Sequence, residues 1–371
     1  MHADDLLPRA TPLRLIEQDG SSHEDDQYPT PSVERMLDGY RKLVLGRRIN
    51  DQANALVRQG RLAVYPSSHG QEACEVAAAM VLADGDWLFP TYRDTVAVIT
   101  RGVEPFDAFQ LLRGDWHSGY DPREHNVAPQ ATPLATQLLH AVGFAHAARM
   151  RGEDTVVLAI CGDGATSEGD FHEAMNFAAV FHLPVVFLVQ NNGYAISVPL
   201  SRQTAAPSIA HKGIGYGMRG RQVDGNDLAA LLAVLGEAVD EARDGGGPTL
   251  VEALTYRIQS HTNADDASRY RSDDEVTPWL ARDPLLRVRA WLRSMDALSD
   301  GDEVELQAHA ERVASDLRAA VNAEAEPHPE DLFAHVYATQ TPQLREQAAQ
   351  LADELARQRQ ADTAHDQEAA R

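Results

Sequence analysis

Asp163 lies between two glycines, directly after the apolar run 155–160 and just before a helical pattern over 168–181. A helix that begins there offers free N–H groups that can bind a phosphate group. The next apolar run, 184–190, is followed by two asparagines, the second of which is Asn192. If these segments form a right-handed crossover between parallel strands, Asp163 and Asn192 lie at the same edge of the sheet. A carboxylate and an amide oxygen beside a phosphate group suit Mg²⁺, so the pattern predicts a site for a magnesium-bound phosphate compound.

Other phosphate-binding motifs do not fit the glycines around Asp163. A dinucleotide-binding turn needs the pattern G-x-G-x-x-G, whereas the third glycine here, Gly169, comes too late. A P-loop needs a lysine after its last glycine, but Asp170 follows Gly169 and would repel phosphate. An isolated Asp-Gly pair could also be a plain turn. This interpretation is less favoured here because a strand, a helix and an asparagine pair occur in the same unit.

Strand and helix patterns alternate from residue 155 onward, and these elements must position the side chains. After the second apolar run come a turn over 223–227, a helical pattern to about 243 and a further strand over 249–256. Continuous apolar strands that alternate with helices are typical of a parallel sheet covered on both faces, so we expect an α/β fold. Helical patterns before this region cover about 33–60, 70–83, 93–101, 104–113 and 134–150.

The chain divides into three parts by composition and periodicity. Residues 1–30 are acidic and unperiodic, and we expect them to form a flexible or partner-clasping arm. Residues 31–275 form the predicted α/β domain that binds the phosphate compound and its metal ion. Residues 276–371 are charged, and their pattern predicts a C-terminal helical region with a polar tail.

Charge and composition exclude several classes of protein. The chain has 371 residues with 33 basic and 56 acidic side chains, which gives a formal charge of −23. This acidity argues against binding to nucleic acid or to an anionic membrane surface, and no apolar run approaches the ~20 residues that span a bilayer. The chain has two cysteines, Cys74 and Cys161, and no visible secretory signal, so we expect a cytoplasmic protein.

A longer comparison of motifs points to one family. The glycine–aspartate–glycine turn, a gap of 26 residues and the asparagine pair together resemble the thiamine-diphosphate motif. The whole string 162–197 is similar to the alpha subunit of thiamine-dependent 2-oxo acid dehydrogenases. The resemblance covers about residues 33–340 and includes the strings FPTYRD, TPLATQ, QVDGND, GPTLVEALTYR and SHTNADDASRYRS. It implies the α/β fold that binds thiamine diphosphate.

The resemblance implies a ligand set for the cofactor and its metal ion. Mg²⁺ would be held by Asp163, Asn192 and the backbone carbonyl of Tyr194. The motif turn would bind the diphosphate group, with contacts from Gly162 and from the backbone amides of Gly164 and Ala165.

Two further segments match cofactor contacts in the family. Tyr92 and Arg93 match a pair that binds the diphosphate, a role that suits the planar and permanently charged guanidinium group. Leu134 matches a backbone contact to the aminopyrimidine ring. Some relatives also bind K⁺ around that loop, and the ion would here fall on Ala131, Pro133, Thr136 and Gln137.

Two histidines match positions in the active site of the family. His261 matches a loop histidine near the cofactor, and His117 resembles a second one. A histidine that titrates near neutral pH could pass protons during acyl transfer. At one position the chain departs from the family: some relatives place an arginine before the asparagine pair, and this chain has Gln190, so one charged contact to the diphosphate is missing.

The resemblance also implies partners and a reaction. In the two-chain dehydrogenases the beta subunit supplies the catalytic glutamate, so we expect an α₂β₂ heterotetramer. The complex would decarboxylate a small 2-oxo acid and transfer the acyl group to a lipoyl-bearing dihydrolipoyl acyltransferase. The strings PLATQ and NNGYAIS look most like the branched-chain enzymes, which favours 3-methyl-2-oxobutanoate over pyruvate, with acetoin third. Alternatives are a non-catalytic relative, which the presence of Asp163, Asn192 and His261 disfavours, and a transketolase-type half, which the C-terminal helices disfavour.

Overall fold

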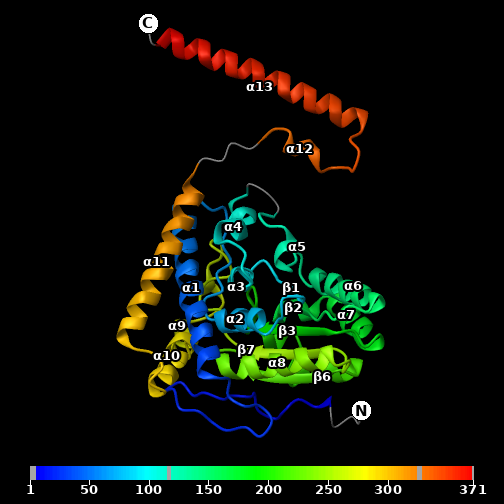
Figure 1. Ribbon diagram of the computed structural model, residues 1–371, viewed down its shortest axis with the longest axis vertical. Helices are drawn as coiled ribbons and strands as arrows, with labels where there is room; N and C mark the ends of the chain where they lie inside the picture. Colours follow the sequence, from blue (N-terminus) through cyan, green and yellow to red (C-terminus); the bar gives the residue numbers. More distant parts are fainter. Residues whose placement is uncertain (1–5, 115–117, 324–327, 370–371) are drawn as a thin grey trace. The chain divides into compact units, whose positions relative to one another are not determined.

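The computed structural model describes residues 6–114, 118–323 and 328–369, and within them a sheet of five parallel strands forms the centre of the fold (Figure 1). The order of strands across this sheet is β1-β2-β3-β7-β6. The predicted α/β fold with a parallel sheet is therefore confirmed. The strands are β1 (Trp87–Phe89), β2 (Val157–Gly162), β3 (Val185–Asn191), β6 (Arg219–Asp224) and β7 (Thr249–Leu254). A two-stranded ribbon, β4 (Tyr194–Ala195) and β5 (Val198–Pro199), follows β3.

Both faces of the sheet are covered, and the alternation of side chains along β2 shows how. Leu158 and Ile160 join one apolar core, which also contains residues of α1 (Val33–Arg58), α2 (Glu72–Met80) and α8 (Leu228–Arg243). The alternate side chains of β2, those of Val157, Ala159 and Cys161, point to the opposite face. They join a second core with α6 (Thr136–Arg151) and α7 (Gly169–Val180). Figure 1 shows α8 across the sheet at β6 and β7, and α6 and α7 at its other end. Burial on both faces explains why these strands are continuous apolar runs.

The other helices complete two separate units. The described residues up to Asn322 form one compact unit, in which α10 and α11 pack against α1. The residues from Ala323 onward form a second unit that contains α12 and α13. No helix among the described residues has the length and apolar character needed to cross a membrane. The remaining helices are α3 (Thr95–Thr100), α4 (Pro105–Arg113), α5 (Pro122–His125), α9 (Asp273–Leu280), α10 (Pro284–Ser294), α11 (Asp300–Asn322), α12 (Asp331–Ala334) and α13 (Pro342–Ala369).

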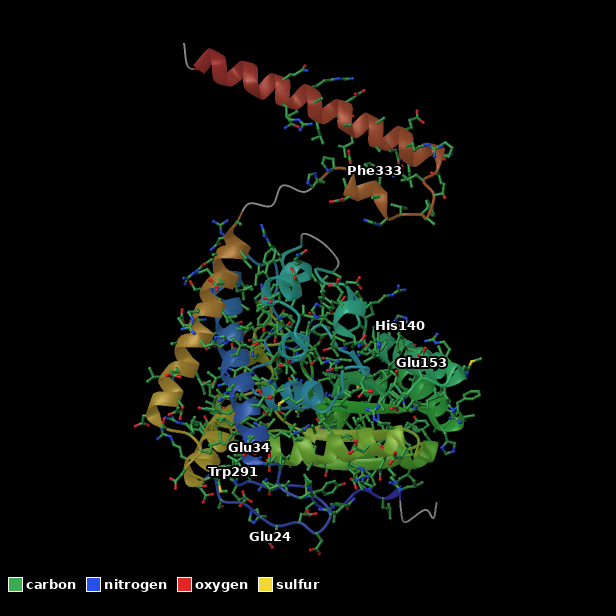
Figure 2. The ribbon with its side chains drawn as sticks, viewed as in Figure 1. Glu24, Glu34, His140, Glu153, Trp291 and Phe333 are labelled. Atoms are coloured by element: carbon green, nitrogen blue, oxygen red, sulfur yellow. The ribbon has the colours of Figure 1, made fainter. Side chains whose placement is uncertain are left out.

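The N-terminal arm, for which we expected a flexible or partner-clasping segment, packs along the sheet in this structure. Leu13 pairs with β6: its N–H donates to Gln222 O and its carbonyl accepts from Asp224 N, both at 2.9 Å. Two further apolar side chains of the arm are fully buried. Gly20, at φ +87°, lies so close to α10 that a Cβ atom would be 2.7 Å from the backbone N of Trp291; Figure 2 labels Trp291 and, farther along the arm, Glu24. Apolar residues scattered through a polar segment thus fix it along the edge of the sheet.

Candidate active site

The candidate residues from separate parts of the chain line one cavity at the carboxyl ends of β2 and β3. Its volume is about 230 Å³. In an open parallel sheet this edge is where ligands bind. His117 lies outside the described residues. All the other residues predicted to contact the cofactor or its metal ion line this cavity: Tyr92, Arg93, Leu134, Gly162, Asp163, Gly164, Ala165, Asn192, Tyr194 and His261.

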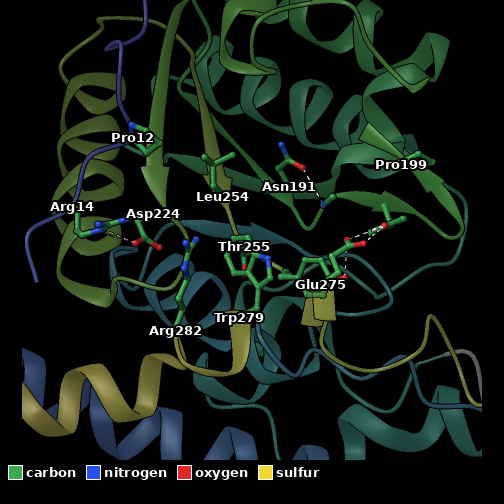
Figure 3. Close-up of a pocket in the computed structure, with 13 residues that line it drawn as sticks. Pro12, Arg14, Asn191, Pro199, Asp224, Leu254, Thr255, Glu275, Trp279 and Arg282 are labelled. Atoms are coloured by element: carbon green, nitrogen blue, oxygen red, sulfur yellow. Dashed lines mark hydrogen bonds and ion pairs between the residues drawn. The ribbon is translucent and has the colours of Figure 1, made fainter. Parts of the chain in front are cut away.

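A second cavity, of about 420 Å³, is lined in part by the loop that follows β3 (Figure 3). Its two carboxylates already have partners. Asp224 accepts from Arg14 Nε at 2.9 Å, and Glu275 accepts from the Tyr194 hydroxyl at 2.8 Å. Of the predicted residues, only Tyr194 lines this larger cavity. The smaller cavity is therefore the candidate active site.

The predicted metal ligands are hard oxygen atoms at two neighbouring strand ends. Asp163 opens the 3₁₀ helix η2 (Asp163–Ser167) after β2, and only 1% of its surface is exposed. Burial raises the pKa of this carboxyl group, so a cation beside it would favour the ionised form. Asn192 Oδ1 accepts from the N–H of Tyr194 at 3.2 Å, which holds the loop after β3 in a tight turn.

A neighbouring glutamine also fits a cation at this place. Gln203 Nε2 donates to Asp163 Oδ2 at 2.7 Å, while its own Oε1 is buried and has no hydrogen-bond partner among the described residues. A buried oxygen without a partner is costly unless a donor or a cation satisfies it. The described residues contain no cluster of three or more His, Cys, Asp or Glu side chains that could hold a metal ion. The predicted set agrees with this, since it uses one carboxylate with an amide and a carbonyl oxygen.

The turn that carries the predicted diphosphate contacts is packed closely against the loop after β3. A Cβ atom added to Gly164 would lie 2.7 Å from Cβ of Ala195. Only glycine fits there without movement of one segment, so the motif glycine is explained by this close approach. The two segments that carry Asp163 and Tyr194 are thereby held next to each other.

Two arginines give the cavity a positive wall. Arg93 is 6% exposed, and its Nη1 donates to Ser67 O at 2.8 Å. Arg257 is 1% exposed, and its Nη2 donates to Ile196 O at 2.8 Å. Two buried guanidinium groups in one cavity suit a ligand with more than one negative charge, such as a diphosphate. Arg257 was not among the predicted residues, although it ends the string GPTLVEALTYR that carried part of the resemblance.

His261 lies between these two arginines, and this changes its expected chemistry. Its Nδ1 is 3.1 Å from Arg93 Nη2 and 3.2 Å from Arg257 Nη1, so this nitrogen accepts and the ring is neutral. Burial, and then the charges of the two arginines, lower the pKa of His261 to about 4. The expectation of a histidine that titrates near neutral pH does not hold for the chain without a bound anion. A diphosphate that paired with the arginines would raise this pKa again.

The loop before α6 is placed at the cavity mouth. Leu134 is 45% exposed there. Pro133 and Gln137, two of the four residues expected to bind K⁺, line the same cavity. Gln137 Nε2 donates to Ile160 O at 2.8 Å, and Thr136 Oγ1 donates to Asp170 Oδ2 at 3.4 Å. The K⁺ site stays a prediction.

Comparisons with known proteins agree with this geometry. A family model described as "Dehydrogenase E1 component" matches residues 40–330. The chain is 48% identical to the 3-methyl-2-oxobutanoate dehydrogenase subunit alpha of Mycobacterium tuberculosis (strain CDC 1551 / Oshkosh), over 93% of this chain and 95% of that protein. It is 37% identical to the Pyruvate dehydrogenase E1 component subunit alpha of Staphylococcus aureus (strain Mu50), over 83% of each chain. These matches confirm the family predicted from the motifs, and the chain belongs to the dehydrogenase E1 component family.

Proposed function

We propose that the chain is the alpha subunit of a branched-chain 2-oxo acid dehydrogenase that binds thiamine diphosphate and Mg²⁺ and acts on 3-methyl-2-oxobutanoate. The observation that carries the proposal is the single cavity in which the buried carboxylate of Asp163, two further oxygen ligands and two buried arginines meet. Thiamine diphosphate supplies the carbon nucleophile and the electron sink that decarboxylation of a 2-oxo acid requires.

The residues of this chain would bind and orient the cofactor. Asp163, Asn192 and the carbonyl of Tyr194 would hold Mg²⁺, and the amides of Gly164 and Ala165 would bind the diphosphate at the start of η2. Arg93 and Arg257 would neutralise its charge, with Tyr92 and Leu134 as further contacts. His261, whose Nε2 carries the proton, would offer that N–H as a donor on the cavity side of the loop.

The substrate assignment rests on the degree of similarity. The relative named for 3-methyl-2-oxobutanoate shares 48% of aligned residues, and the relative named for pyruvate shares 37%. Pyruvate is therefore the second candidate. One methylene in an apolar pocket changes selectivity by ~1–3 kcal/mol, so the pocket chemistry can separate the two acids. A comparison of kcat/KM for both acids tests this: at least a tenfold preference for the branched acid, about 1.4 kcal/mol, supports the assignment, and a preference for pyruvate contradicts it.

A beta subunit and a lipoyl-bearing dihydrolipoyl acyltransferase are the proposed partners, in an α₂β₂ heterotetramer located in the cytoplasm. An exposed aromatic cluster at the C-terminal end of α7 supports a protein contact. Phe177 and Phe181 are 44% and 43% exposed, their ring centroids are 4.6 Å apart, and His146 of α6 lies against both. Adjoining exposed aromatic rings are typical of interaction surfaces. Cys74 and Cys161 are both free, as expected in a reducing compartment.

Replacement of the proposed metal ligand tests the cofactor assignment. In the complex with the beta chain, Asp163→Ala should abolish Mg²⁺-dependent binding of thiamine diphosphate, and Asp163→Asn, which keeps one oxygen ligand, should weaken it. Calorimetry measures the binding. Asp302→Ala, which removes an exposed carboxylate that accepts from the N–H of Ser299 and does not line the cavity, is the control and should bind normally. Wild-type affinity in Asp163→Ala would contradict the proposal.

A further inference from the structure

Three side-chain amides form a hydrogen-bonded chain between Asn192 and the segment that carries Arg93. Asn192 Nδ2 donates to Gln71 Oε1 at 3.0 Å, and Gln71 Nε2 donates to Gln190 Oε1 at 2.9 Å. Gln190 Nε2 in turn donates to Asp94 Oδ1 at 2.6 Å. The four side chains come from the N-cap positions of α2 and α3, from β3 and from the loop after β3, and none is more than 6% exposed.

The donors and acceptors of this hydrogen-bonded chain all run in one direction, which the carboxylate of Asp94 sets. The other oxygen of Asp94 accepts from the N–H of Thr91 at 2.6 Å. Burial raises the pKa of Asp94, while the hydrogen bonds from Thr91 and Gln190 and the charge of Arg93 favour its ionised form. In that form both oxygens accept and neither donates. Gln190 must therefore turn its NH₂ group toward Asp94 and its oxygen toward Gln71. By the same reasoning Gln71 turns its oxygen toward Asn192, and Asn192 turns its NH₂ group toward Gln71. The oxygen of Asn192 is then left on the cavity side, where the N–H of Tyr194 also faces it.

This direction matters for a metal site because a side-chain amide can bind a cation only through its oxygen. An inverted Asn192 would present N–H groups to the cation. Bonds that orient a metal ligand are typically worth tenfold to a hundredfold in metal affinity. The chain also gives a role to Gln190, which from the sequence alone was only the absence of an arginine.

We propose that Asp94, Gln190 and Gln71 are positioning residues, which hold the amide oxygen of Asn192 toward the Mg²⁺ of the cofactor. The inference rests on the proposed function, because Asn192 is a metal ligand only there. A buried polar chain could instead serve packing alone, and the direction of its hydrogen bonds separates the two roles.

Reversal of the chain is the first test. Asp94→Asn keeps the shape of the side chain, but its oxygen must serve the N–H of Thr91, so its NH₂ group faces Gln190. The amide groups of Gln190, Gln71 and Asn192 must then each rotate by about 180° to keep their hydrogen bonds. Asn192 is left with its NH₂ group on the cavity side. In the complex with the beta chain, calorimetry should show that half-maximal binding of thiamine diphosphate needs at least tenfold more Mg²⁺. The loss of a negative charge alone would have the opposite effect and strengthen binding of the anionic cofactor.

A second substitution should restore the direction. In Asp94→Asn with Gln71→Glu, the carboxylate at position 71 accepts from both Gln190 and Asn192, so Asn192 again turns its oxygen to the cavity. The Mg²⁺ requirement should return to within about threefold of wild type. Gln71→Glu alone controls for the added charge. Suppose that Gln71→Glu alone lowers the Mg²⁺ requirement of the wild-type protein by the same factor by which it lowers that of Asp94→Asn. The recovery in the double variant is then a charge effect, and the inference is wrong.

Matched variants separate positioning from packing. Asp227 is also fully buried, lies outside the cavity and accepts four backbone N–H groups, from Leu15, Ile16, Ala229 and Ala230. Asp227→Asn should lower the thermal stability and leave the Mg²⁺ requirement unchanged. If Asp94→Asn behaves like this control, the chain serves packing and the inference is overturned. If Asp94→Asn does not fold, Gln71→Leu cuts the chain beside Asn192 and should show the same tenfold loss. Absence of Mg²⁺-dependent binding in the wild-type complex would instead overturn the proposed function.

Discussion

The close approach of Gly164 to Ala195 allows a quantitative test of how the two metal-binding segments are held together. In Gly164→Ala the new Cβ would lie 2.7 Å from Cβ and 3.3 Å from Cα of Ala195. Nonbonded carbon atoms prefer a separation of about 3.5–4.0 Å. The turn that carries Asp163 and the loop that carries Tyr194 must therefore move apart by about 1 Å.

The size of the effect follows from the cost of this overpacking. Extra methyl groups in a well-packed region cost about 1–3 kcal/mol. Mg²⁺ tolerates little change in its ligand distances of about 2.0–2.1 Å, so binding would have to pull the two segments back together. If the cost appears in binding, the affinity for magnesium thiamine diphosphate falls roughly 5- to 140-fold.

A neighbouring glycine provides the control. Gly169 begins α7, it is not among the residues that line the cavity, and no atom lies within 4 Å of a Cβ added there. Gly169→Ala should therefore bind magnesium thiamine diphosphate much more tightly than Gly164→Ala. Calorimetry on the complex with the beta chain measures both. Binding by Gly164→Ala within twofold of wild type would refute the reasoning, because the segments would then adapt without cost.

Three further predictions concern other parts of the molecule. The pKa of His261, about 4 in the cofactor-free chain against an ordinary 6.5, favours the neutral ring in the folded state, so its contribution to stability is complete above pH 6.5 and is lost as the pH falls toward 4. An NMR titration should show this low pKa and its rise when thiamine diphosphate binds; a value near 6.5 without cofactor would contradict the structure. Arg287→Ala should lower the free energy of unfolding by about 3 kcal/mol in urea, because it breaks a buried 3.0 Å ion pair with Asp224; a loss below about 1 kcal/mol would contradict this. Phe177→Ser with Phe181→Ser should weaken association with the beta chain at least tenfold in sedimentation velocity, without loss of the fold, and unchanged association would exclude this cluster from the interface.

The sequence predicted the middle of the sheet better than its edges. β2, β3 and β7 are buried on both faces, so each is a continuous apolar run that can be recognised locally. β1 has three residues, and β6 carries arginines that pair with glutamates of α8, so neither shows an apolar run. β6 is also where the N-terminal arm pairs through Leu13. Whether an arm is packed depends on a surface formed elsewhere in the chain, which composition does not describe.

In the site, the spacing of a few residues was enough to predict the chemistry of the motif. Asp163 and Asn192 each follow a strand, so the crossover rule alone places them at one edge and predicts a magnesium and phosphate site. Only the tertiary structure showed Arg257 in the cavity wall, the neutral state of His261 between two arginines, and the hydrogen-bonded chain through Gln71. The reason is physical: local spacing fixes which residues share a strand end, whereas a pKa or an amide orientation depends on burial and on partners far apart in the sequence.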